Sequence, residues 1–184
     1  MKFLKYLLIL LLVLVLAFIA KGLLTPSINF ASAEVFVNKP ANEAWEVMSD
    51  KENLTKWIKG FKRTELVSGT PNTVGAVSNV YVEEGGQEMV MQETIKEVDL
   101  HKRLAMEFKM DFMDMDYEIT FDEIKGKTSI KSNSITKGNG MFAKSIVSFM
   151  KGSMKSQEDE NLGTLKKLIE ENTKDYFGDV VELQ

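Results

Sequence analysis

The chain has 184 residues, of which 44% are hydrophobic and 27% charged, a composition typical of one globular domain or at most two small ones. It contains no cysteine, which excludes disulfide bonds, cysteine-based zinc sites and thiol nucleophiles. The formal net charge is -4, and only two basic residues are arginines, so we expect repulsion from a phosphate backbone and no nucleic-acid partner.

The N-terminal segment is strongly apolar. Residues 6–20 form an uninterrupted apolar run that follows Lys2 and Lys5. A bilayer needs about 20 helical residues, and the stretch from residue 5 to residue 24 is long enough. We therefore expect residues 1–24 to be a transmembrane anchor. The two lysines predict a single-pass protein of the cytoplasmic membrane, with its N-terminus inside and the rest of the chain facing outward.

Ala31-Ser32-Ala33 offers an alternative, because signal peptidases accept small residues at this spacing. Cleavage there would release a secreted or periplasmic protein. The site lies thirteen residues beyond the apolar run, however, and cleavage would remove the residues leading into a predicted strand. We expect the anchor to be retained, and cleavage stays open as the alternative.

The first part of the remaining chain mixes short elements. Residues 25–31 contain Pro26 and Ser27 and are expected to be a linker. Residues 32–39 alternate like a strand and lead into Pro40, which suits the first turn of a helix. Two short helices are predicted over residues 41–50 and 51–58, the second capped by Asp50.

The second part is more regular. Residues 61–136 alternate with a period of two between turn signals, which predicts about six antiparallel strands with one apolar face. From residue 141 to about residue 172 the period becomes helical. Residues 173–184 are expected to form an irregular C-terminal tail.

This order of elements resembles that of the START-like superfamily, also called SRPBCC, which includes the polyketide cyclase/dehydrase and lipid-transport families. The resemblance rests on VFVNKPANEAWEVMSDKENLTKWI, in which a strand runs into Pro40, Trp45, Asp50 and Trp57 at the family's usual spacing. Thr73-Val74-Gly75 and LGTLKKLIE, residues 162–170, also match. The similarity covers residues 32–172. It implies an α+β helix-grip fold, in which a curved antiparallel sheet wraps around the long C-terminal helix.

The resemblance also implies a cavity between the sheet and the long helix that holds an apolar or amphipathic molecule. Many of the inward candidates are methionines, whose adaptable side chains suit a lipid, an isoprenoid or a polyaromatic compound. The same residues could instead form a filled core. The candidate ligand-binding residues are Met89, Met91, Glu93, Met106, Phe108, Met110, Tyr117, Ile119, Phe121, Phe142, Ile146, Phe149 and Met150.

Glu93 and Tyr117 are the candidate polar groups of this site. Glu93 shares the parity of Met91, so it points inward unless a bulge turns it outward; both interpretations stay open. A buried carboxyl group would have a raised pKa and could act as an acid or a base. His101 is expected in a solvated turn, and Glu158-Asp159-Glu160 on the exposed surface of the long helix. No catalytic constellation is visible, and we expect no cofactor and no metal site.

Two functions follow from these observations. The first is membrane-tethered binding of a hydrophobic or amphipathic small molecule or lipid. The alternative is an enzyme of the polyketide cyclase/dehydrase type that uses Glu93 or Tyr117. Whether the protein is an enzyme therefore stays open at the level of sequence, with binding as the leading hypothesis.

Overall fold

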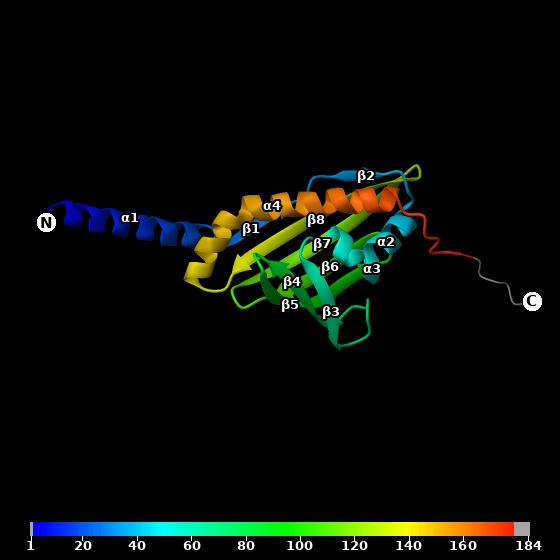
Figure 1. Ribbon diagram of the computed structural model, residues 1–184, viewed down its shortest axis with the longest axis horizontal. Coiled ribbons are helices and arrows are strands. Elements are labelled where there is room, and N and C mark those ends of the chain that lie inside the picture. Colours follow the sequence, from blue (N-terminus) through cyan, green and yellow to red (C-terminus); the bar gives the residue numbers. More distant parts are fainter. Residues whose placement is uncertain (1, 179–184) are drawn as a thin grey trace, which may run out of the picture.

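The computed structural model describes residues 2–178 as four helices and one antiparallel sheet of eight strands (Figure 1). The helices are α1 Lys2–Leu24, α2 Ala41–Ser49, α3 Lys51–Trp57 and α4 Met141–Glu170. The strands are β1 Ser27–Ala31, β2 Val35–Val37, β3 Phe61–Ser68, β4 Val77–Glu84, β5 Gln87–Asp99, β6 Arg103–Lys109, β7 Met113–Ile124 and β8 Lys127–Gly138.

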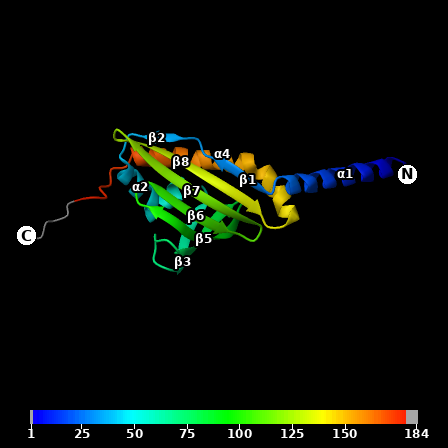
Figure 2. The ribbon, with the colours of Figure 1, turned by 180° about the vertical axis from the view of Figure 1, so that it is seen from behind.

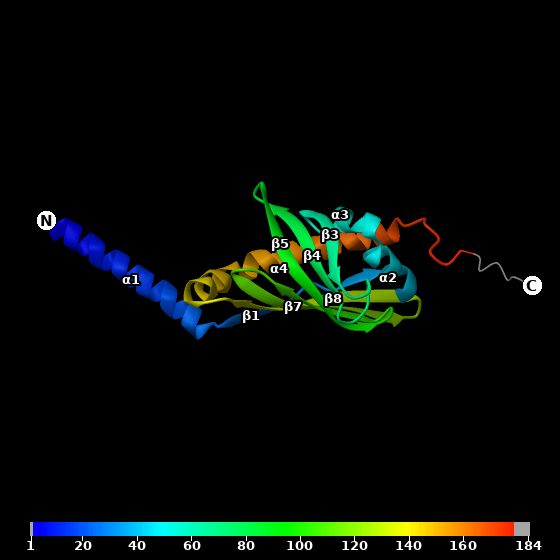
Figure 3. The same cartoon turned by 90° about the horizontal axis from the view of Figure 1, so that it is seen from below.

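Strands β3–β8 form an antiparallel meander, and β1 and β2 pair with its last strand. The order of the sheet is β1-β8-β7-β6-β5-β4-β3, and β2 pairs with β8 beyond the end of β1. Seen from below, β3, β4 and β5 curl out of the layer formed by β7 and β8 (Figure 3). Seen from behind, the outer face of β5–β8 carries no helix (Figure 2). The expected α+β helix-grip fold, with a curved antiparallel sheet and a long C-terminal helix, is confirmed.

The expected linker over residues 25–31 is instead mostly a strand. β1 pairs with β8 along its whole length, and Ile28 and Phe30 are only 4% and 7% exposed. Pro26 precedes the strand, where its missing N–H removes no ladder hydrogen bond. The strand expected over residues 32–39 is shorter, Val35–Val37. Residues 173–178 have no helix or strand, and the rest of the predicted tail lies outside the described residues.

Two apolar clusters lie at opposite ends of the β7–β8 hairpin. The larger one surrounds Trp45 and Phe121, whose ring centroids are 5.5 Å apart, and includes buried leucines of the C-terminal half of α4. The smaller one contains Ile28, Phe30 and Met113 and packs against the N-terminal half of α4. The register fixes their separation, because Phe121 pairs with Ile130 near the hairpin turn, whereas Met113 pairs with the last residue of β8.

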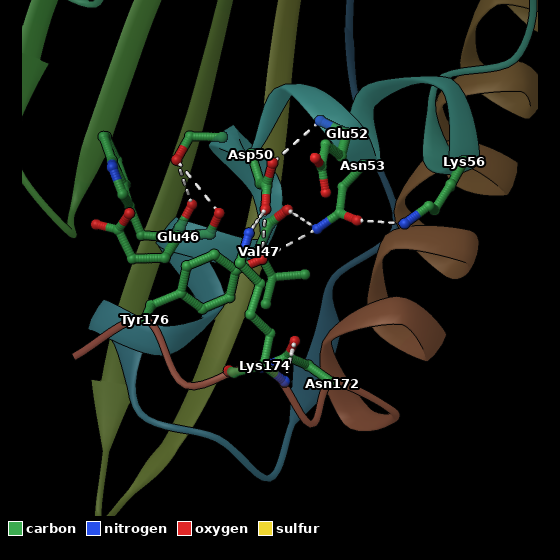
Figure 4. Close-up of polar contacts among 11 residues, drawn as sticks. Glu46, Val47, Asp50, Glu52, Asn53, Lys56, Asn172, Lys174 and Tyr176 are labelled. Atoms are coloured by element: carbon green, nitrogen blue, oxygen red, sulfur yellow. Dashed lines mark hydrogen bonds and ion pairs between the residues drawn. The ribbon is translucent and has the colours of Figure 1, made fainter. Parts of the chain in front are cut away.

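The corner between α2 and α3 is fastened by Asp50 (Figure 4). One carboxylate oxygen accepts a hydrogen bond from the backbone N–H of Glu52, at 3.0 Å, and so caps α3. The other oxygen accepts hydrogen bonds from Lys174 Nζ at 2.7 Å and from the Tyr176 hydroxyl at 2.9 Å. Hydrogen bonding from Lys174 is the main cause that lowers the pKa of Asp50. These two hydrogen bonds hold the segment after α4 against the corner between α2 and α3.

Replacing Asp50 with alanine should lower the free energy of unfolding at pH 7 by at least about 1 kcal/mol, the usual cost of a lost N-cap. Because the pKa of Asp50 is depressed in the fold, its ionic contribution is present above its ordinary pKa and is lost as the pH falls. Urea denaturation of the full-length protein in mild detergent should therefore show the difference shrinking below about pH 4. Asp50→Asn, which keeps a capping oxygen, should be less harmful; equal stability of wild type and Asp50→Ala would contradict this role.

A second prediction concerns β1. Removing residues 2–24 should leave the fold intact. Removing residues 2–33 should lower the free energy of unfolding by about 3–6 kcal/mol, because the buried side chains of Ile28 and Phe30 are deleted. Urea midpoints of the two shortened proteins provide the comparison. If both unfold at the same urea concentration, β1 contributes nothing, and cleavage after Ala33 would be compatible with a stable domain.

Candidate functional site

The pairing of strands identifies which side chains point toward α4. Glu93 lies opposite Ser78 on β4 and opposite Phe108 on β6, both of which are buried. The bulge in β5 falls between Ile95 and Glu97, beyond Glu93, so it does not turn this residue outward. Of the two interpretations left open by the sequence, the inward one is correct.

We call the concave side of β4–β8 the inner face; it is not packed uniformly. Ile119 and Phe121 are 1% and 2% exposed and belong to the filled core around Trp45. Phe108 is also buried. Four inward candidates on β5, β6 and the following turn are only partly buried, namely Met89, Met91, Met106 and Met110. Protein interiors are normally close-packed. Solvent therefore reaches the methionine-rich part of the inner face.

The position of α4 explains this difference. Its close neighbours in the sheet are β8, β1 and β2, which form one side of the sheet. In Figure 3, β4 and β5 stand away from that side. The helix therefore covers the β8 side of the sheet closely, and the methionine side of the inner face is left partly uncovered.

The four candidates on α4 fall on two faces of the helix. Met150 is partly buried and shares a face with Val147, which packs on β1 residues. Phe142, Ile146 and Phe149 are 62%, 48% and 57% exposed. The ring of Phe149 stacks on Phe18 of α1, with centroids 5.8 Å apart. Phe149 therefore contacts α1 instead of the inner face, and Phe142 and Ile146 are exposed instead of packed on the sheet.

A hydrogen-bonded group crosses the inner face beneath α4. Both the Tyr117 hydroxyl, at 2.8 Å, and Ser132 Oγ, at 2.6 Å, donate to the same carboxylate oxygen of Glu158. Burial, followed by the charge of Glu158, raises the pKa of Tyr117 well above its usual value. Tyr117 is therefore a hydrogen-bond donor at neutral pH and not a base.

Glu158 was expected on the exposed helix surface, and this was wrong. It lies four residues after Met154 and four before Leu162, so it falls on the apolar stripe that faces the sheet. This spacing in the sequence could have predicted that Glu158 faces the sheet. Of its neighbours, Glu160 is exposed and pairs with Lys59, whereas Asp159 is partly buried, pairs with Lys155 and accepts a hydrogen bond from the backbone N–H of Ala33.

Glu93 is the other carboxyl group of the inner face. Burial raises its pKa, and no hydrogen bond or positive charge within the described residues opposes that shift. A carboxyl group in this setting keeps its proton to a higher pH than an exposed one. Together, Glu93 and the Tyr117–Glu158 pair supply ionisable groups to a surface that otherwise carries apolar side chains and small hydroxyl side chains such as those of Ser78, Ser134 and Thr136.

Two hollows open elsewhere on the surface. One, of about 990 Å³, lies between the start of α2 and the turns at His101 and Ile124, and the other, of about 270 Å³, lies between α3 and α4. Neither is lined by the inward methionines. Within residues 2–178, no group of three or more His, Cys, Asp or Glu side chains could hold a metal ion. The chemistry of the inner face is therefore that of apolar contact with a few proton donors and acceptors.

Several solved structures share this architecture. Ara h 8.0201 aligns with a TM-score of 0.62 and 16% identity, over 79% of this chain and 99% of that one. The di-domain ARO/CYC StfQ from the steffimycin biosynthetic pathway aligns with a TM-score of 0.65 and 10% identity, over 80% of this chain and 52% of that one. SA2116 from Staphylococcus aureus, described as a protein of unknown function, aligns with a TM-score of 0.61 and 12% identity, over 78% and 94%. At these identities the likeness shows a shared fold alone.

No curated protein matches the sequence. A family does match it, the one described as "Polyketide cyclase / dehydrase and lipid transport", over residues 31–170. The match begins at the last residue of β1 and ends at the last residue of α4, so it covers nearly the whole sheet and the helix that grips it. The chain therefore belongs to the polyketide cyclase/dehydrase and lipid-transport family.

Proposed function

We propose that the protein is a membrane-tethered binding domain for a hydrophobic or amphipathic small molecule or lipid, which occupies the methionine-rich inner face. The observation that carries this proposal is the partial burial of inward-facing methionines, beside a core that is completely filled. Flexible, polarizable side chains that are not fully packed can rearrange around an irregular apolar ligand. Membership of a family that includes lipid-transport proteins supports the same function.

The charges of the inner face favour some ligands over others. Glu93 and Glu158 both lie on it, and the inward positions of β4–β8 carry no lysine, arginine or histidine. An anionic head group would meet two carboxyl groups and no compensating cation. A ligand with a neutral or cationic polar end, able to bond Tyr117 or a carboxyl oxygen, fits this face better.

The proposed tether is α1, which is 23 residues long and apolar enough to cross a membrane. Only Thr25 and Pro26 separate α1 from β1, and β1 buries Ile28 and Phe30 in the sheet. Cleavage at Ala31-Ser32-Ala33 would remove this strand together with α1. The buried strand therefore supports retention of the anchor. The proposed orientation, with the binding domain outside the cytoplasmic membrane, rests on Lys2 and Lys5 before the apolar run.

Catalysis of the cyclase/dehydrase type is the second candidate function, and Glu93 is the observation that favours it. A buried carboxyl group with a raised pKa and no partner is the kind of group that serves as a general acid or base. Tyr117, whose single proton is donated to Glu158, would offer its hydroxyl oxygen as an acceptor to a donor group of the substrate. The two candidate functions use the same inner face and differ in whether the bound molecule is changed.

Met91→Trp should reduce the amount of bound ligand several-fold, because the larger ring would fill part of the inner face. Val90→Trp is the matched control, since Val90 immediately precedes Met91 in β5 and is exposed on the opposite side of the sheet. Both full-length variants and wild type would be purified in mild detergent from membranes of the native host. Native mass spectrometry would then measure the bound small molecule, and urea denaturation would check folding. Equal ligand in both variants, or none in wild type, would contradict binding at this face.

Glu93→Gln should make the protein more stable than wild type at pH 8 and equally stable near pH 4. The folded state holds the Glu93 proton more tightly than the unfolded state, so wild-type stability falls as the pH rises above the ordinary pKa of glutamate. Urea midpoints at the two pH values test this, with the exposed Glu84→Gln as a control that should show no gain. A loss of stability at pH 8 would show that the charged carboxylate is needed for folding.

The same variant separates the two functions. If the protein only binds its ligand, Glu93→Gln should retain a molecule of the same mass as wild type retains. If it is an enzyme that uses Glu93, the variant should accumulate the unconverted substrate, which has a different mass or structure.

A further inference from the structure

The N-terminal half of α4 exposes an apolar surface. We call it the α4 apolar surface; it consists of Met141, Phe142, Ile146 and Phe149, all of which are exposed. Three of these are large residues spaced by three or four positions, so they lie along one side of the helix. Nothing in the inner face requires them, because Ala143 and Val147 occupy the side of the helix that is buried.

The start of α4 lies beside the end of α1, as Figure 1 shows. The two helices approach so closely at Gly22 and Ser145 that a side chain at Gly22 would collide with Ser145. Phe18 stacks on Phe149, and Lys21 Nζ lies 3.8 Å from the centre of the same ring. The contact between α1 and α4 is thus a packed one and fixes the position of the α4 apolar surface along α1.

That position corresponds to a depth in the bilayer. Phe18 belongs to the apolar run of residues 6–20 and lies six residues, about 9 Å, before the end of α1. A residue that stacks on Phe18 lies at the same level as the apolar part of α1. Interfacial helices bury their apolar side about 5–10 Å into the boundary between head groups and acyl chains, which matches this level.

The charges nearby agree with a lipid surface. Residues 132–157 contain Lys137, Lys144, Lys151 and Lys155 and no acidic residue, in a chain whose net charge is -4. Lys155 is paired with Asp159 on α4, whereas the other three form no ion pair with any residue between positions 2 and 178. Asp111 and Asp114, in and after the β6–β7 turn, oppose this charge in part, so apolar contact is the main attraction.

We propose that the N-terminal half of α4 lies in the interfacial layer of the membrane beside α1, with the α4 apolar surface in contact with lipid. This inference rests on the proposed tether, because α1 sets the depth. The smaller apolar cluster and the methionine-rich end of the sheet lie at this end of the β7–β8 hairpin. The domain would therefore rest on the membrane with its loosely packed end nearest the lipid and its filled core farthest away.

The absence of cysteine makes a direct test simple, because single cysteines can be placed and labelled without removing native ones. Phe142→Cys and Ile146→Cys report on the proposed contact. Thr164→Cys, exposed on the C-terminal half of the same helix, is the matched control, and Leu12→Cys reports on the middle of α1. Each full-length variant would carry an environment-sensitive fluorophore and be reconstituted into vesicles of phosphatidylcholine and phosphatidylglycerol, with or without brominated lipid.

Labels at residues 142 and 146 should show blue-shifted emission and several-fold stronger quenching by brominated lipid than the label at residue 164. Water-like emission at residues 142 and 146, with residue 12 quenched, would overturn the interfacial position and leave the tether standing. Blue-shifted emission without quenching would also overturn it, because the surface would then be covered by protein, such as a second copy of the chain. If residue 12 is not quenched either, the proposed tether itself is wrong.

Discussion

The close approach of α4 to β8 is the contact on which the rest of the structure depends. The inward positions at the end of β8 are small: Ser132, Ser134, Thr136 and Gly138 are all buried. A side chain at Gly138 would collide with the backbone of Ala143 and Lys144, so glycine is required where the helix begins. Because α4 packs in close contact with β8, it lies to one side of the sheet instead of over its centre. That displacement leaves the methionines partly uncovered and brings the start of α4 against α1.

The two ends of the domain have different physical characters. At the end that holds α2 and α3, aromatic and branched side chains interlock around Trp45, and the segment after α4 is tied down by Asp50. At the other end, unbranched methionines dominate, and their packing is incomplete. Under the proposed function, the rigid end holds the curvature of the sheet while the other end accepts molecules of different shapes without loss of the fold. Glu93 and the Tyr117–Glu158 pair lie between these ends, where the proposed ligand would place its polar end.

The fold could be predicted from the sequence because alternation along the strands and the strand–helix–helix start are local patterns. The inward direction of Glu93 depended on where the β5 bulge falls, and local alternation alone left it open. Three errors have a common origin in long-range contact. The sequence of residues 25–31 alone predicts a linker, because the pairing of these residues with β8 is a long-range contact. In the same way, Glu158 is predicted to be exposed, because its contact with Tyr117 on β7 is not visible in the local pattern. Phe142, Ile146 and Phe149 looked like the buried stripe of α4, because the sequence pattern does not reveal that α1 packs against that part of the helix.

The short connection between α1 and β1 limits how far the domain can travel. Two residues, Thr25 and Pro26, span at most about 7 Å, and the strand that follows is hydrogen-bonded into the sheet. A domain held this way cannot carry cargo across an aqueous gap to another membrane, as a freely diffusing carrier does. With α1 in the bilayer, its working range is the plane of one membrane, where it moves by lateral diffusion. If the protein binds a lipid as proposed, its exchange partners must be in that membrane or must come to it.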